Sequence, residues 1–203
     1  MARFAQLMRP VIGTTIVDIG GGARTWTDLA TAPHVTIVNT DLQEAAPDGE
    51  NVRFAEADAR SLPFEDSSFD IAFSNSVIEH VGSFADQGRM AREMRRVAPA
   101  YYLQTPARSF PIEPHYLTPF VHWLPRRLRR RILRNFTVWG LITRPSQEYV
   151  DFSVSTTRLL DRAELEHLFP DATLIPEKWL GLTKSWVVVR RTASPERTDG
   201  VVG

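Results

Sequence analysis

Apolar and polar positions along the chain predict strands and helices that alternate. Short runs of apolar, mostly β-branched residues, such as TIVDI and FDIAF, are typical of strands buried on both faces of a parallel sheet. Segments with apolar residues on one side of a 3.6-residue period predict helices between them. The expected strands are residues 14–19, 35–40, 52–55, 69–74, 98–104, 172–176 and 184–190. The expected helices are residues 2–9, 24–31, 83–97 and 161–168.

This alternation predicts an α/β fold in which helices cover both faces of a mostly parallel sheet. Ser83 and Asp161 are expected to cap the helices that follow them, and the last two strands to form an antiparallel pair at the sheet edge. Residues 109–148 break the alternation, because proline and aromatic residues are followed there by a strongly basic run. We interpret residues 1–203 as a single domain with a cap inserted at about 106–150 and a flexible tail at 193–203.

Composition narrows the range of functions. A chain of 203 residues is long enough for one domain with a full core. It has 24 basic and 24 acidic residues, so no overall charge attracts nucleic acid, and we expect no dedicated nucleic-acid partner. The absence of cysteine excludes disulfides, thiolate metal sites and a cysteine nucleophile. No run of about 18 apolar residues predicts a membrane span, and we expect a cytoplasmic protein.

The glycine-rich turn after the first strand, in the segment TTIVDIGGG, is the strongest local signal. A strand, a glycine turn and a helix in this order predict a cradle for a nucleotide-like ligand, since glycine lets the backbone approach closely and a helix N-terminus offers N–H groups. A dinucleotide fingerprint would need a small residue where Thr25 stands, and a phosphate-binding loop would need a lysine that is missing. Both alternatives are therefore disfavoured.

Four segments at consistent spacing carry a family resemblance. They are Asp18-Ile19-Gly20-Gly21-Gly22, Asp41 after the second strand, the run ADARSLPF…SFD with Asp58-Ala59, and Ser74-Asn75-Ser76-Val77-Ile78-Glu79-His80-Val81. Together they resemble the class I S-adenosylmethionine-dependent methyltransferases, in particular the type 11 branch, over roughly residues 11–105. Arg24 stands where the family often has a further glycine. Several motifs in register along one α/β pattern are more specific than a single glycine turn.

The resemblance implies a Rossmann-like methyltransferase fold with seven strands in the order 3-2-1-4-5-7-6. It implies S-adenosylmethionine as cofactor and S-adenosylhomocysteine as product, bound across the carboxyl ends of the central strands. Asp41 would accept hydrogen bonds from the ribose, and Asp58 and Ala59 would bind the adenine. The expected cofactor-binding residues are Asp18, Gly20, Gly21, Gly22, Asp41, Leu42, Asp58, Ala59, Ser74 and Asn75.

Candidates for catalysis follow from histidine positions. His115 lies in FPIEPHY, where two prolines fix the backbone around Glu113, so we predict His115 as a general base oriented by Glu113. His80 is the second candidate. The run F-P-x-E-P-H is similar to one in type 11 enzymes of glycan-modifying pathways, which implies a carbohydrate hydroxyl as methyl acceptor. The substrate-binding candidates are Glu79, Tyr116 and Trp123.

Alternatives remain open at this point. The acceptor could be a small amine, a carboxylate or a lipid-like molecule, or the chain could bind S-adenosylmethionine without catalysis. We expect no metal, with a divalent cation held by Glu79, His80, Glu113 and His115 as a minority alternative. The basic residues 126–134 predict an amphipathic helix with its apolar side on the core. Further hypotheses for this helix are peripheral membrane contact, an acidic or phosphorylated substrate, and nucleic acid. The expected partner is a small-molecule or oligosaccharide acceptor, and the expected state is a monomer or homodimer.

Overall fold

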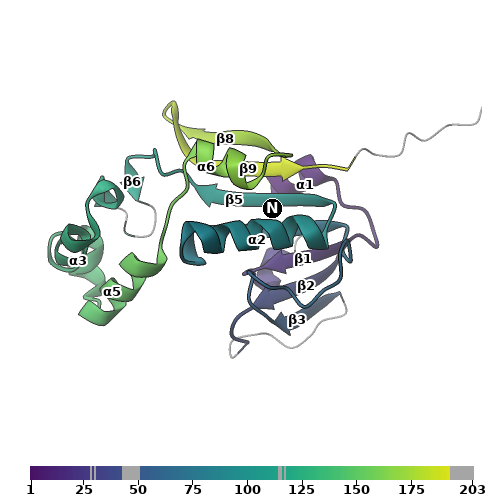
Figure 1. Ribbon diagram of the computed structural model, residues 1–203, viewed down its shortest axis with the longest axis horizontal. Coiled ribbons are helices and arrows are strands. Elements are labelled where there is room, and N and C mark those ends of the chain that lie inside the picture. The colour runs from purple at the N-terminus through teal and green to yellow at the C-terminus, as the bar shows by residue number, and fades with distance from the viewer. Residues whose placement is uncertain (28, 30, 43–50, 114–115, 117, 193–203) are drawn as a thin grey trace, which may run out of the picture.

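The computed structural model describes residues 1–27, 29, 31–42, 51–113, 116 and 118–192. Their main feature is a sheet with the strand order β3-β2-β1-β4-β5-β9-β8 (Figure 1). Only β9 runs antiparallel to its neighbours β5 and β8. This arrangement confirms the expected order 3-2-1-4-5-7-6. The strands are β1 (Thr15–Ile19), β2 (His34–Asn39), β3 (Val52–Glu56), β4 (Ile71–Asn75), β5 (Ala100–Pro106), β8 (Thr173–Trp179) and β9 (Leu182–Arg190).

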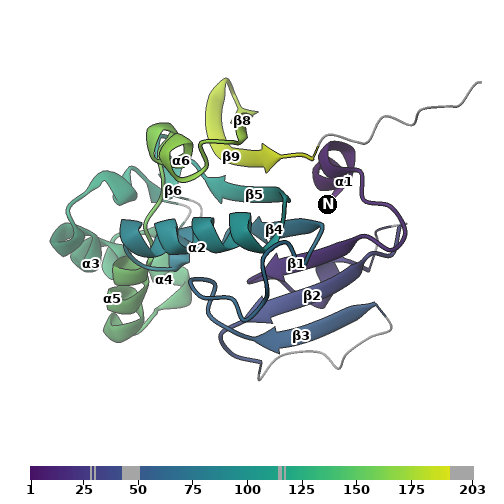
Figure 2. The same cartoon turned by 45° about the vertical axis from the view of Figure 1, so that its right-hand side comes forward.

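Helices lie on both faces of the sheet, as the alternating pattern predicts (Figure 2). On one face, α2 (Phe84–Val97) and α6 (Arg162–Leu168) pack against Val17 and Leu103 in the larger hydrophobic core. On the other face, α1 (Ala2–Met8) packs through Phe4, which is 1% exposed. The sheet is therefore buried on both sides, which explains why its central strands are almost wholly apolar.

Both predicted helix caps are confirmed. The Ser83 side chain accepts a hydrogen bond from the Asp86 backbone N–H, and the Asp86 carboxylate accepts one from the Ser83 backbone N–H in return. Asp161 and Glu164 form the same reciprocal pair at the start of α6. Each pair satisfies two backbone donors that a helix N-terminus leaves free, and this fixes where α2 and α6 begin.

The expected helix over residues 24–31 is wrong. Among the described residues of this segment, the glycine turn is followed by η1 (Ala23–Thr25), a single 3₁₀ turn, and by no α-helix. Trp26 then turns into the core: its indole Nε1 donates a 2.7 Å hydrogen bond to Asp18 Oδ2, and its ring packs edge-on against Phe4 and Phe73. Burial of a large aromatic side chain outweighs the weak helix preference of this threonine-rich segment. No long helix N-terminus therefore faces the glycine turn in the described part of the chain.

The cap is larger than expected and has its own hydrophobic core. It begins after β5, which itself extends to Pro106, and its last helix reaches Thr156 instead of ending near residue 150. Tyr116, Leu133 and Val150 are at most 4% exposed and pack together. The elements of the cap are β6 (Ile112–Glu113), β7 (Thr118–Pro119), η3 (Val121–Trp123), α3 (Arg126–Asn135), α4 (Val138–Thr143) and α5 (Gln147–Thr156).

The basic segment forms the amphipathic helix that the sequence predicts. Leu133 of α3 is fully buried, although against the core of the cap and not against the sheet. Arg130 forms an ion pair with Asp151 of α5 on the surface. Peripheral membrane contact through residues 126–134 stays a prediction. None of the described helices is long and apolar enough to cross a membrane.

Asp18 should make the stability of the protein depend on pH. Burial raises the pKa of this carboxyl to about 7, despite the hydrogen bond from Trp26 that acts in the opposite direction. The folded state therefore retains a proton that the unfolded state loses near pH 4. The stability that Asp18 contributes is fully present below pH 4 and is lost as the pH rises through 7. The difference of about 3 in pKa corresponds to a loss on the order of 4 kcal/mol.

Chemical denaturation of the wild type and of Asp18→Asn between pH 4 and pH 8 measures this contribution. Asparagine can still accept the Trp26 hydrogen bond, but it does not titrate. We expect the difference in unfolding free energy between the two proteins to change by a few kcal/mol across this range, in favour of the variant at high pH. Parallel curves for the two proteins would contradict the assignment.

Candidate active site

Two cavities lie where the carboxyl ends of the strands meet the cap. The first, which we call the sheet-edge cavity, has a volume of about 440 Å³. It is bounded by the ends of β1 and β2, the loop after β3, the segment after β4 and the end of α5. The carboxyl ends of parallel strands are the usual ligand site in open α/β sheets. Its lining residues are Ile19, Gly20, Val38, Asn39, Thr40, Ala57, Asp58, Ala59, Arg60, Val77, His80, Val81, Gly82 and Thr156.

The glycine turn shapes this cavity through close approaches of the backbone. Gly20 has φ +76°, and a Cβ atom there would lie 2.5 Å from Val77 Cγ2. A Cβ atom on Gly21 would lie 1.8 Å from Asp18 Oδ2. Gly22 differs, because nothing lies within 4 Å of a Cβ atom at that position. The first two positions therefore require glycine on steric grounds and the third does not.

Asp58 gives the sheet-edge cavity a carboxylate of fixed orientation. Its Oδ1 atom accepts hydrogen bonds from the Arg60 backbone N–H at 2.8 Å and from the Arg60 guanidinium at 2.9 Å. These hydrogen bonds hold the pKa of Asp58 below its usual range, so the group is ionised at neutral pH and accepts hydrogen bonds. Ala59 lies beside it and is 8% exposed.

The other residues predicted to bind a cofactor take different positions around the turn. Asp18 is fully buried beneath it, where Oδ2 accepts from Trp26 and Oδ1 has no hydrogen-bond partner among the described residues. Ser74 donates to the Ile19 carbonyl at 3.2 Å and ties β4 to β1. Asp41 and Leu42 follow directly after Thr40, which lines the cavity. Direct contacts from Asp18, Asp41, Leu42, Ser74 and Asn75 to a ligand stay predictions.

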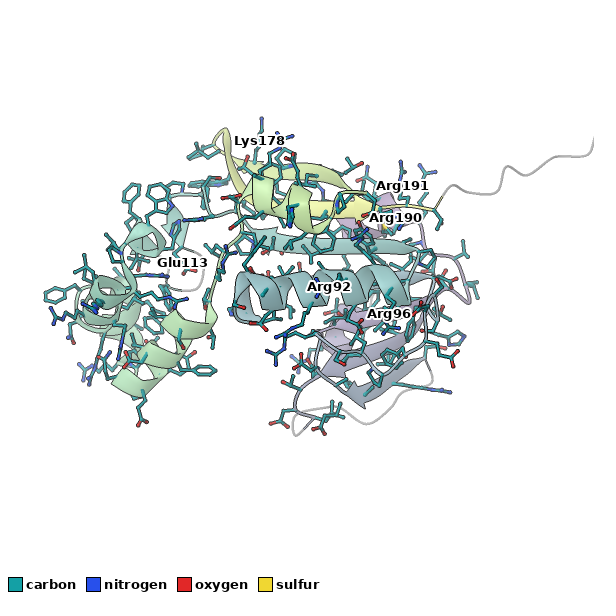
Figure 3. All side chains as sticks on the ribbon, viewed as in Figure 1. Arg92, Arg96, Glu113, Lys178, Arg190 and Arg191 are labelled. Atoms are coloured by element: carbon teal, nitrogen blue, oxygen red, sulfur yellow. The ribbon has the colours of Figure 1, made fainter. Side chains whose placement is uncertain are left out.

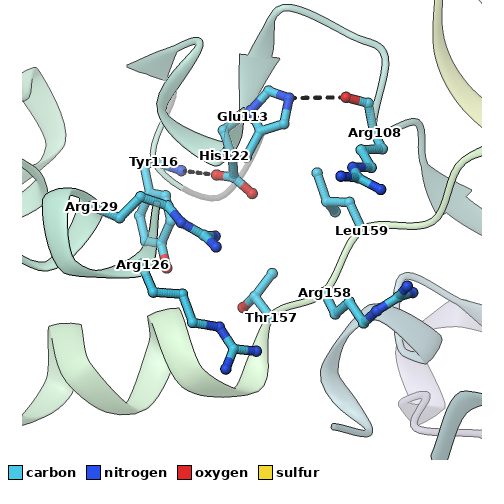
Figure 4. A pocket seen from close by; sticks show the side chains of 9 residues that line it. All are labelled: Arg108, Glu113, Tyr116, His122, Arg126, Arg129, Thr157, Arg158 and Leu159. Atoms are coloured by element: carbon cyan, nitrogen blue, oxygen red, sulfur yellow. Dashed lines mark hydrogen bonds between the residues drawn. The ribbon is translucent and has the colours of Figure 1, made fainter. Parts of the chain in front are cut away.

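The second cavity, which we call the arginine cavity, lies inside the cap and has a volume of about 190 Å³ (Figure 4). Glu113, which Figure 3 shows between the cap helices and the sheet, is 1% exposed and lines it. Glu113 Oε2 accepts a 2.9 Å hydrogen bond from the Tyr116 backbone N–H. Four of the lining side chains are cationic. The lining residues are Arg108, Glu113, Tyr116, His122, Arg126, Arg129, Thr157, Arg158 and Leu159.

A single stretch of chain separates the two cavities, and we call residues 156–159 the wall. Thr156 lines the sheet-edge cavity, whereas Thr157, Arg158 and Leu159 line the arginine cavity. The Arg158 backbone N–H donates to the Glu79 carbonyl at 2.7 Å, and the buried Gln87 amide donates to the Arg158 carbonyl at 2.8 Å. The wall is thus attached to the segment after β4 and to α2.

The candidate catalytic residues are only partly described by the structure. His80 lines the sheet-edge cavity, and its Nδ1 atom lies 3.4 Å from the Thr157 hydroxyl of the wall. Glu113 lines the arginine cavity. His115 lies outside the described residues, so its role as base stays a prediction. His80 and Glu113 therefore approach the wall from opposite sides.

Of the three residues predicted to bind the substrate, one lines a cavity and two make hydrogen bonds within the protein. Glu79 is fully buried and accepts a 2.9 Å hydrogen bond from the Thr105 hydroxyl, away from both sets of lining residues. Tyr116 lines the arginine cavity, but Trp123 uses its indole N–H to bond the Arg108 carbonyl at 2.9 Å. Among the described residues, no group of three or more histidine or acidic side chains could hold a metal ion. The cation alternative also involves His115, which is not described.

The sequence did not point to the wall, and it pointed to the cationic lining only through the basic segment 126–134, for which an acidic or phosphorylated substrate was one hypothesis. Arg126 and Arg129 are three residues apart, a spacing that places two side chains on one side of a helix, and this signal was available. Arg108 and Arg158 come from distant parts of the chain, and only the tertiary structure brings them to the same cavity. No sequence motif around Thr156 and Thr157 predicted that they would lie between two cavities.

Comparisons with known proteins agree with the fold. Residues 17–99 match the family model described as a methyltransferase domain, of the type 11 group. A crystallised S-adenosylmethionine-dependent methyltransferase of Methanosarcina mazei superposes with a TM-score of 0.50 at 20% identity, covering 87% of this chain and 91% of that one. A protein of Pyrococcus horikoshii gives a TM-score of 0.54 at 19% identity, with 93% and 85% covered.

A third similar structure contains ligands. The phosphoethanolamine N-methyltransferase 2 of Haemonchus contortus, in complex with phosphomonomethylethanolamine and S-adenosylhomocysteine, gives a TM-score of 0.58 at 17% identity. The comparison covers 86% of this chain and 37% of that one. At such identities the likeness shows the fold. Taken together, the comparisons show the fold of the class I methyltransferases, and the family match covers residues 17–99 of this chain.

The three glycines allow a matched test of the turn. Gly21→Ala should destabilise the protein by about 1–3 kcal/mol, because the new Cβ atom must displace the Asp18 carboxylate that is bonded to Trp26. Gly22→Ala should change stability by about 0.5 kcal/mol or less, since the position is open and has extended backbone angles. Urea denaturation measures both. Equal effects at the two positions would contradict this account of the turn.

Proposed function

We propose that this protein transfers the methyl group of S-adenosylmethionine to a hydroxyl group of a carbohydrate or glycan-related small molecule. The observation that carries the donor part of the proposal is the sheet-edge cavity. It lies at the carboxyl ends of β1 and β2, in the strand order of the methyltransferase fold, and Gly20, Asp58 and Ala59 line it. These are three of the residues to which the family resemblance assigns donor binding.

The properties of the cavity fit this donor. S-adenosylmethionine has a ribose and an adenine amine that donate hydrogen bonds, and the fixed carboxylate of Asp58 is an acceptor for such groups. Gly20 leaves room at a point where any side chain would collide with Val77, so the backbone can contact a ligand.

Methyl transfer requires little covalent chemistry from the protein. S-adenosylmethionine supplies an electrophilic methyl group on a sulfonium sulfur, so the protein has to align an acceptor behind that methyl group. A hydroxyl acceptor must also lose its proton, and a base within hydrogen-bond reach accelerates this loss. We assign this role to His115, oriented by Glu113, with His80 as the alternative. In support, Glu113 is held by Tyr116 in the cavity that Thr157 of the wall also lines, and His80 lies on the wall's other side.

Size supports a small acceptor. The arginine cavity of about 190 Å³ is comparable to an engineered cavity of about 150 Å³ that holds a benzene molecule. A single sugar ring or a ring-sized part of a larger molecule fits this space. The amine-methylating relative shares the fold with this chain, and no feature of the described cavities favours an amine over a hydroxyl acceptor.

Calorimetry with S-adenosylhomocysteine tests the donor site. The acceptor is tested by incubating the protein with S-adenosylmethionine and a panel of sugars, amines and carboxylic acids, and measuring the S-adenosylhomocysteine formed with each. We expect His115→Ala to bind S-adenosylhomocysteine as the wild type does and to lose about 10²–10⁴-fold in transfer rate. His34→Ala serves as a control, because His34 starts β2 at the opposite end of the strand.

The outcomes separate the parts of the proposal. Absence of S-adenosylhomocysteine binding would refute donor use. Turnover with amines alone would refute the hydroxyl acceptor. If His80→Ala abolishes transfer while His115→Ala retains it at every pH, the base is His80.

A further inference from the structure

We propose that the arginine cavity binds an anionic group of the acceptor, a phosphate or a carboxylate, through Arg126 and Arg129. This inference rests on the proposed function, because it assigns the acceptor of the same site. It narrows the acceptor from a sugar-like hydroxyl compound to one that carries negative charge, such as a sugar phosphate or a sugar acid.

The first argument is charge. Four arginines line the cavity against one glutamate, and burial lowers the pKa of His122, which therefore adds no charge at neutral pH. A concentration of one sign of charge inside a concave, partly buried site attracts ligands of the opposite sign. The whole chain has equal numbers of basic and acidic residues, so this excess is local.

Two of the four arginines are already engaged. The Arg158 guanidinium forms an ion pair with Glu164, donates to the Gln87 side chain at 2.8 Å and lies over the Phe84 ring. Arg108 lies 3.7 Å from Asp161. These two arginines form the sides of the cavity, and their charges are largely balanced by acidic residues outside it.

Arg126 and Arg129 differ from the other two. Neither forms an ion pair with an acidic residue of the described chain, although both line the cavity from the first turns of α3 (Figure 4). The Arg129 Nε atom is buried and has no hydrogen-bond partner among the described residues. Burial and the neighbouring Arg126 charge both lower the pKa of Arg129, and the nearby Tyr116 and Glu113 groups offset this only in part. A buried donor of this kind is costly unless a ligand satisfies it.

Geometry favours a planar or tetrahedral oxyanion. Arginine presents its donors as a rigid fork that matches two oxygens of a carboxylate or phosphate. Arg126 and Arg129 both project into one cavity, so two forks are available to an anionic group bound there (Figure 4). A neutral sugar would bring no negative charge to Arg126 and Arg129, which have Glu113 as the one acidic residue in the described lining of the cavity.

The location connects this anion site to methyl transfer. Thr157 lines the arginine cavity and bonds His80, which lines the sheet-edge cavity. An acceptor anchored by Arg126 and Arg129 therefore lies next to the wall, and the rest of the molecule can extend past it toward the donor. In this arrangement the arginines position the acceptor, and a histidine acts as the general base that removes the proton of its hydroxyl group.

The test compares three probes of similar size: glucose 6-phosphate, glucuronate and glucose. Their affinities are measured by calorimetry on the full chain, with and without saturating S-adenosylhomocysteine. We expect at least one anionic probe to bind about tenfold or more tightly than glucose, as charge-assisted hydrogen bonds allow. The phosphate and carboxylate arms distinguish the two sources of anionic charge. Binding should also weaken at high ionic strength.

The variant Arg126→Gln/Arg129→Gln should lose this preference by about tenfold or more. The control Arg127→Gln/Arg131→Gln removes the same charge from the same helix, at positions that do not line the cavity. It should retain the preference. Unchanged affinity for S-adenosylhomocysteine shows that each variant is folded, and Arg129→Lys, which keeps the charge, should retain part of the preference if the first variant unfolds.

Equal affinity for glucose and both anions in the wild type would overturn the proposal, as would an equal loss in the control variant. Failure of the underlying function has a different signature. In that case S-adenosylhomocysteine does not bind, while the preference for anions in the absence of S-adenosylhomocysteine remains measurable and is still decided by Arg126 and Arg129.

Discussion

The hydrogen bond between the Trp26 indole and the Asp18 carboxylate is the contact on which the binding edge of the sheet depends. It joins the end of β1 to the chain that leaves the glycine turn, and it holds Trp26 against Phe4 from α1. The Asp18 carboxylate lies so close to Gly21 that no side chain fits there. The shape of the turn, the packing of α1 and the floor of the sheet-edge cavity are therefore linked through one buried acidic group.

The cap gives this sheet a second, chemically different compartment. The sheet-edge cavity is lined by apolar and polar residues, in which the Asp58 carboxylate is paired with Arg60, whereas the arginine cavity is cationic. The wall connects the cap to the sheet domain. It begins at the last residue of α5 in the cap, and it is hydrogen-bonded to Gln87 of α2 and to the Glu79 carbonyl. Burial of Leu133 and Val150 in the cap's own core keeps α3 and α5 in contact, which positions the arginines opposite the wall.

The sheet was predictable from sequence because its signals are local. Runs of β-branched residues, the glycine turn and the capping pairs at Ser83 and Asp161 act over a few residues and require little tertiary information. The expected helix at 24–31 failed because Trp26 turns into the core and packs there against Phe4 and Phe73, which are distant in the sequence. The arginine cavity was not foreseen for the same reason, since Arg108 and Arg158 meet only after the cap has closed. Local pattern predicted the sheet and its glycine turn, and tertiary contacts determine the arginine cavity.

The wall between the cavities has a consequence for how two ligands would influence each other. Gln87 is fully buried and donates to the carbonyls of Ile78 and Arg158, so the two sides of the wall share one rigid anchor. A ligand that shifts Thr156 from one side also shifts Thr157 on the other. Whatever free energy the first ligand gains or loses by this shift must reappear in the affinity of the second, in equal amount and in either order of binding. The short segment of backbone in the wall is thus a route by which binding at one cavity can change the affinity at the other, and any such effect is equal in both directions.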